Sequence, residues 1–200
     1  MTALLILSPP REKLLMNGIR SASRAAYGAA VLFVMSLARF FFIPRLGLAA
    51  DSPIVAELNG GLLPVAAHLI LFPVVAALPA PPWARAAGYG WLVIDITTDI
   101  MALQGVADTT YLPMRYGGHV SAALWIAAAS WQAGGVICVV GMLLALILGG
   151  YSFIPHGPLG ILIASGPLLP LWFVLVGHWL ARHTPFATDQ SGIGKQPSAL

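Results

Sequence analysis

Long apolar runs, separated by short polar stretches, dominate the pattern of residues along the chain. A helix needs about 20 consecutive apolar residues to cross roughly 30 Å of hydrocarbon, and runs of about this length recur. The pattern therefore predicts an all-α fold, a polytopic transmembrane helix bundle, for which we expect five spans. Their predicted ranges are 25–48, 61–80, 86–106, 120–150 and 158–181.

The run 120–150 decides between five spans and six. A helix of this length would measure about 46 Å at 1.5 Å per residue. That is too long for one upright span and too short for two spans with a turn between them. We interpret the run as one helix that begins outside the hydrocarbon and bends near Gly134 and Gly135. The preceding stretch, 107–119, is predicted to be a polar loop.

Lysine and arginine residues near the spans predict the orientation, because cytoplasmic flanks are enriched in them. Residues 1–24 are predicted to form a basic cytoplasmic flank, since four of these residues precede the first span: Arg11, Lys13, Arg20 and Arg24. Five spans would leave five Lys and Arg residues inside and four outside, whereas six spans would leave seven inside and two outside. Charge thus favours six spans and length favours five, and we give length more weight.

The composition agrees with a membrane location and excludes other classes. Hydrophobic residues make up 58% of the chain and charged residues only 8%, against about 25% charged in soluble domains. We therefore expect a multi-pass protein of the cell membrane, with residues 25–181 as one transmembrane domain and 182–200 as a disordered polar tail. The net charge of +3 comes without a basic stripe, so nucleic acid is not an expected partner. The single cysteine, Cys138, excludes an internal disulfide.

The informative residues are the polar ones inside the apolar runs. A charged side chain at mid-membrane costs roughly 2.5 to 3.5 kcal/mol on insertion scales, so it normally finds a partner. Counting along helices of alternating direction places Arg39, His68 and Asp99 at one level, each about 10 Å from the outer boundary. We therefore predict a clasp between helices in which Arg39 pairs with Asp99.

Asp95 lies one helical turn deeper than Asp99 and on the same helix face. Thr98 lies beside them. Two carboxylates this close and away from water do not both carry charge easily unless a cation compensates. One arginine needs only one carboxylate, so the clasp does not account for Asp95. This leaves a second hypothesis, in which these groups bind a proton, an ion or a small polar ligand.

The other histidines and the charged residues beside the spans suggest no cofactor site. A b-type haem would need two facing histidines at matched depth, and His68 and His178 match poorly, so no cofactor is expected. His119 and Arg115, like Asp51 and Glu57, are interpreted as solvated anchors beside spans, with the mouth of a pocket as the alternative.

No catalytic or metal-binding motif was found, so no catalytic residue and no metal ligand is assigned. The favoured hypothesis is a non-catalytic structural or regulatory membrane protein with an Arg–Asp clasp. The alternative is a small proton- or ion-linked permease or binding protein that uses Asp95 and Asp99, tuned by Arg39 and His68. A lipid-modifying enzyme or a haem protein comes third.

A small-residue ridge is predicted to pack against another helix. Gly141, Ala145 and Gly149 follow one another at four-residue spacing, which allows close approach of two helix backbones. The partner helix could belong to the same chain or to a second copy, so a homodimer through this ridge is one possibility.

Overall fold

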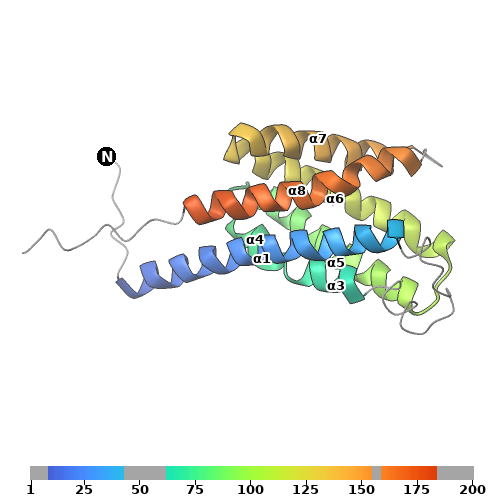
Figure 1. Cartoon of the computed structure of the whole chain (residues 1–200), viewed down its shortest axis with the longest axis horizontal. Helices are drawn as coiled ribbons and strands as arrows, with labels where there is room; N and C mark the ends of the chain where they lie inside the picture. Colours follow the sequence, from blue (N-terminus) through green and yellow to red (C-terminus); the bar gives the residue numbers. More distant parts are fainter. Residues whose placement is uncertain (1–8, 43–61, 155–158, 184–200) are drawn as a thin grey trace, which may run out of the picture.

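The computed structural model describes residues 9–42, 62–154 and 159–183, of which 9–15, 39–42 and 159–164 are described by backbone only. This part of the chain is all helical, as predicted, and contains no strand (Figure 1). The helices are α1 (Pro9–Phe42), α3 (Leu62–Leu69), α4 (Phe72–Ala77), α5 (Pro82–Leu103), α6 (Asp108–Ala133), α7 (Gly135–Ser152) and α8 (Leu159–Arg182).

Two segments of the described residues are long and apolar enough to cross a membrane. They are Met16–Ala38, within α1, and Gly135–Ser152, which is α7. The structure therefore agrees with an apolar helical bundle, but it does not confirm five spans.

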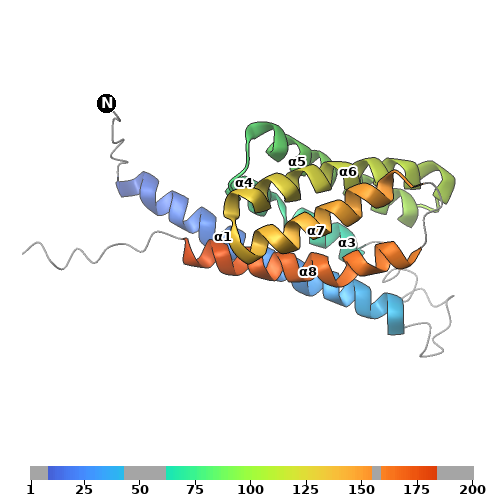
Figure 2. The same ribbon diagram turned by 90° about the horizontal axis from the view of Figure 1, so that it is seen from above.

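The run 120–150 is divided between two helices, so the prediction of a single bent helix is wrong. Helix α6 ends at Ala133, and α7 begins at Gly135 and runs back alongside it (Figure 2). Gly134 and Gly135 both have a positive φ, 73° and 57°, which glycine adopts without steric cost. Two glycines are thus enough to reverse the chain.

The predicted loop 107–119 is also wrong, because α6 already begins at Asp108. An acidic residue in the first turn suits the positive end of a helix dipole. The polar residues that suggested a loop are accommodated in the helix, since Arg115 pairs with an aspartate of α5. Because α6 begins at Asp108 and not near residue 120, the chain has enough residues here for two helices.

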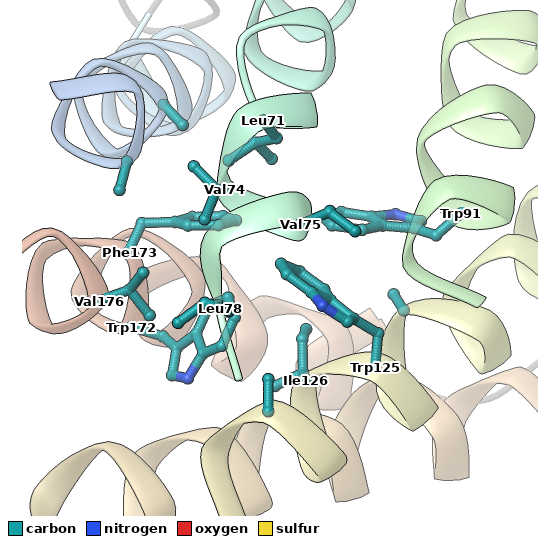
Figure 3. Packing of buried hydrophobic residues seen from close by; sticks show 14 of the residues in the cluster. Leu71, Val74, Val75, Leu78, Trp91, Trp125, Ile126, Trp172, Phe173 and Val176 are labelled. Carbon is teal, nitrogen blue, oxygen red and sulfur yellow. The ribbon is translucent and has the colours of Figure 1, made fainter. Parts of the chain in front are cut away.

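Helices α3 and α4 form one broken helix in the centre of the bundle. The break at Ile70 and Leu71 precedes Pro73, whose ring nitrogen cannot donate a hydrogen bond to the carbonyl of Leu69. Beyond the break, α4 carries fully buried apolar side chains. Figure 3 shows Val74 beside Phe173 of α8 and Val75 facing Trp91 of α5.

A closed circuit of aromatic rings links the helices around this centre. Ring centroids lie 5.1 to 5.8 Å apart at each step of the circuit. Offset and edge-to-face pairs at such distances are favourable beyond the area they bury. The members come from α1, α3, α5, α6 and α8 and are, in order, Phe33, His68, Trp91, Trp125, Trp172 and Phe173.

Helices α1 and α8 run antiparallel side by side. The Ser23 hydroxyl donates a hydrogen bond to the backbone oxygen of Gly177, 2.8 Å away, and Leu37 packs at Gly166. The beginning of α1 and the end of α8 therefore lie at the same end of the bundle (Figures 1 and 2).

The small-residue ridge of α7 packs within the chain. Gly141 faces Ser130 of α6 and Trp172 of α8, and Gly149 faces Ala123 of α6. Because these contacts occupy the ridge, a homodimer, which stays a prediction, would need another surface.

Candidate functional site: a buried ionic cluster

One face of α5 carries four polar side chains into the interior. Trp91, Asp95 and Asp99 follow at four-residue spacing, and Thr98 lies beside them, so all share one helix face. All four are buried, and the two aspartates are each only 4% exposed. Buried carboxylates need compensating partners, and the neighbouring helices provide them.

His68 of α3 lies between the two aspartates. Its Nε2 is 3.3 Å from Oδ2 of Asp95, and its Nδ1 is 3.4 Å from Oδ2 of Asp99. Edge-to-face contacts with Phe33 and Trp91 hold the imidazole ring in this position. His68 and Asp99, for which the sequence predicts the same depth in the bundle, are thus in direct contact.

Arg115 of α6 completes the cluster from the third helix. Its guanidinium forms an ion pair with Asp99, and its Nε donates a hydrogen bond to the Thr98 hydroxyl, 3.2 Å away. The Thr98 hydroxyl in turn donates to the backbone oxygen of Asp95 at 3.0 Å. With its side chain 26% exposed, Arg115 connects the buried aspartates to the surface of the bundle.

Asp95 has a distinct environment from Asp99. Its Oδ2 accepts a hydrogen bond of 2.6 Å from the indole Nε1 of Trp91, whereas its Oδ1 has no hydrogen-bond partner among the described residues. Oδ1 points at Gly118 of α6, where a Cβ would lie 2.8 Å from it. Glycine at this position therefore lets α6 approach α5 at the level of the cluster.

The structure brings together four of the five residues predicted for the ligand site: His68, Asp95, Thr98 and Asp99. The side chain of Arg39 lies outside the described residues, so its pairing with Asp99 stays a prediction. Asp51 and Glu57 also lie outside them. His178 is exposed on α8 and is not a member of the cluster.

Sequence reasoning missed Arg115 because it assigned this residue to a loop. The signal was present in the spacing around the α5–α6 turn. Once 108–133 is helical, Arg115 lies seven residues after the beginning of α6, and Thr98 and Asp99 lie five and four residues before the end of α5. Gly118 and Asp95 each lie three residues further from the turn than Arg115 and Thr98. An antiparallel pair of helices brings such positions face to face.

His119 lies one helical turn after Arg115 and close to the cluster. Its Nδ1 is buried and has no hydrogen-bond partner among the described residues, and its ring is 6.2 Å from that of Tyr116. In the described part of the chain, no three His, Cys, Asp or Glu side chains are arranged to hold a metal ion.

Three helices thus share one buried network of charges and hydrogen bonds. With both aspartates ionised and His68 neutral, the cluster of His68, Asp95, Asp99 and Arg115 would carry one net negative charge. With His68 protonated it would be neutral. The cluster can therefore hold its buried charges by ion pairing between helices.

Comparisons with known proteins add no functional assignment. No protein-family model matches the sequence. No curated protein and no solved structure matches it either.

Proposed function

We propose that the chain is a small multi-pass membrane protein without catalytic machinery, structural or regulatory in role, whose α3, α5 and α6 are clasped by the buried ionic cluster. The observation that carries the proposal is the ion pair of Arg115 with Asp99, joined to α3 through His68. An unpaired charge is costly in an apolar interior, and a paired one fixes how helices pack.

The exposed surface supports a lipid environment. Helix α7 directs large apolar side chains outward, with Val139 70% and Leu146 72% exposed. An apolar surface along a whole helix is unusual for a soluble monomer and is what contact with lipid tails requires. Trp131, 73% exposed at the end of α6, suits the membrane interface, where tryptophan is enriched.

The distribution of basic residues supports six crossings, with α3 and α4 together making one of them. The beginning of α1, the end of α8 and the beginning of α5 share one end of the bundle (Figure 2). Four arginines are carried by these segments: Arg20, Arg24, Arg85 and Arg182. By the positive-inside rule this end is cytoplasmic, and an even number of crossings returns the chain to it.

A double-mutant cycle tests the clasp. Arg115→Ala leaves the Asp99 carboxylate buried without its cation, which typically costs 3 to 5 kcal/mol. Because Arg115 is partly exposed, we expect about 3 kcal/mol in the free energy of unfolding in detergent micelles. Arg115→Ala combined with Asp99→Ala should recover part of the loss.

The matched control is Arg182→Ala, an exposed arginine of α8 whose loss should change the free energy of unfolding by less than about 0.5 kcal/mol. If Arg115→Ala resembles this control, or if the two single effects simply add, the clasp does not exist.

A second candidate, a proton- or ion-linked permease or binding protein, is favoured by one specific observation. His68 lies in the last turn of α3, directly before the break in the central helix. Discontinuous helices at the centre of a bundle are typical of ion and substrate sites in transporters.

A further inference from the structure

The two ring nitrogens of His68 face carboxylate oxygens of two different aspartates, at 3.3 and 3.4 Å. The Nδ1 of His68 and the Oδ2 of Asp99, which lie at the longer distance, are both buried and have no hydrogen-bond partner among the described residues. A neutral imidazole has one N–H donor and one lone pair. In the neutral form, one of the two contacts would therefore place a lone pair against an ionised carboxylate oxygen. Only the imidazolium can present an N–H group to Asp95 and Asp99 at the same time.

The charges around His68 also favour its protonated form. From α5 it faces Asp95 and Asp99; from α6 the nearest charged or titratable groups are Arg115 and His119. From α1 it faces the uncharged ring of Phe33. One added proton brings the buried group of His68, the two aspartates and Arg115 to zero net charge.

We infer that the ionic cluster is a binding site for one proton, held by His68 between Asp95 and Asp99. The inference rests on the cluster of the proposed clasp and adds a ligand to it. The proton is taken from hydronium in the surrounding water, so an O–H bond of hydronium breaks as the N–H bond of His68 forms, and release of the proton reverses this step.

Loss of the proton should weaken the contact between α3 and α5. A neutral His68 keeps an attractive contact with only one aspartate, and the other contact becomes repulsive.

Nuclear magnetic resonance of the full chain in lipid bilayers, with ¹⁵N-labelled histidine, tests the inference. The His68 signals are those missing from a His68→Gln variant. At about pH 7.5, where a free imidazole is protonated in only about one molecule in ten, we expect both His68 nitrogens to carry hydrogen. A His68 that is neutral at this pH overturns the inference.

Asp95→Asn supplies the second measurement. This change removes one carboxylate, so His68 and Asp99 with Arg115 are neutral without an added proton, and we expect His68 to be neutral at about pH 7.5. The control is Asp108→Asn, an exposed carboxylate at the beginning of α6, which should leave the His68 signals unchanged. A His68 that stays protonated in Asp95→Asn overturns the proposed site.

The outcomes separate this inference from the clasp. If the effects of Arg115→Ala and Asp99→Ala on the free energy of unfolding are additive, the proposed clasp is wrong. If these effects are strongly coupled but His68 is neutral, the clasp stands and only the proposed proton site is wrong. If Asp95→Asn fails to fold, the protonation state of His68 in the unmodified chain still tests the proposed proton site.

Discussion

Gly141 lies where α7 crosses both α6 and α8, and substituting it by alanine is a stringent test of the bundle. A Cβ at this position would overlap the Ser130 hydroxyl and lie 2.6 Å from Ser130 Cβ and 2.7 Å from Trp172 Nε1. It would also disturb the hydrogen bond that the Trp172 indole donates to the Ser130 hydroxyl at 2.9 Å. Gly141→Ala should therefore separate three helices that now touch.

The expected magnitude follows from these contacts. Inserting a methyl group into a packed core costs typically 1 to 3 kcal/mol, and losing a hydrogen bond adds about 1 kcal/mol. The better helix propensity of alanine returns roughly 0.5 to 1 kcal/mol. We therefore expect Gly141→Ala to lower the free energy of unfolding by about 1 to 3.5 kcal/mol.

Gly150→Ala, in the same helix, is the matched control. A Cβ at Gly150 would meet nothing within 4 Å, so only the propensity gain remains, about 0.5 to 1 kcal/mol of stabilisation. Both variants are measured by reversible unfolding in mixed micelles, followed by tryptophan fluorescence. Equal effects of the two substitutions would refute the packing of α7 against α6 and α8.

Further predictions address the cluster, the turn and the topology. Trp91→Phe removes the indole donor to the buried Asp95 and should cost roughly 1.5 to 3 kcal/mol in the same unfolding assay; an unchanged free energy of unfolding would contradict this hydrogen bond. Gly134→Ala should lower the free energy of unfolding by about 1 to 3 kcal/mol, because its φ of 73° and ψ of −173° are open almost only to glycine; a stabilisation like that of Gly150→Ala would contradict the turn. Topology reporters fused to each terminus should both report the cytoplasm, whereas opposite sides would contradict six crossings.

The part of the site that could be predicted from the sequence is the part that lies on one helix. Asp95, Thr98 and Asp99 share a face because of helical periodicity alone, and charges within an apolar run mark that face without any tertiary information. Depth counting also related His68 to Asp99, since helices that cross the same membrane alternate in direction.

The rest of the site could not be predicted, because it depends on where α6 begins. The polar composition of 107–119 was interpreted as solvated, but Arg115 forms its ion pair inside the bundle, so polarity there reflects a buried partner. This misplacement concealed the cation of Asp99 and also made 120–150 appear too short for two helices. The break between α3 and α4 was not predicted either, because proline is tolerated within many membrane helices.

The central claim is that one buried ionic cluster joins α3, α5 and α6, and internuclear contacts within it test this claim most directly. We suggest solid-state magnetic resonance in liposomes, measuring dipolar coupling between ¹⁵N of His68 and the ¹³C carboxyl groups of the aspartates. The separations of 3.3 and 3.4 Å between nitrogen and oxygen predict clear contacts of His68 with both Asp95 and Asp99, each lost in the corresponding asparagine variant. Contact with neither aspartate, or with only one, would contradict the account.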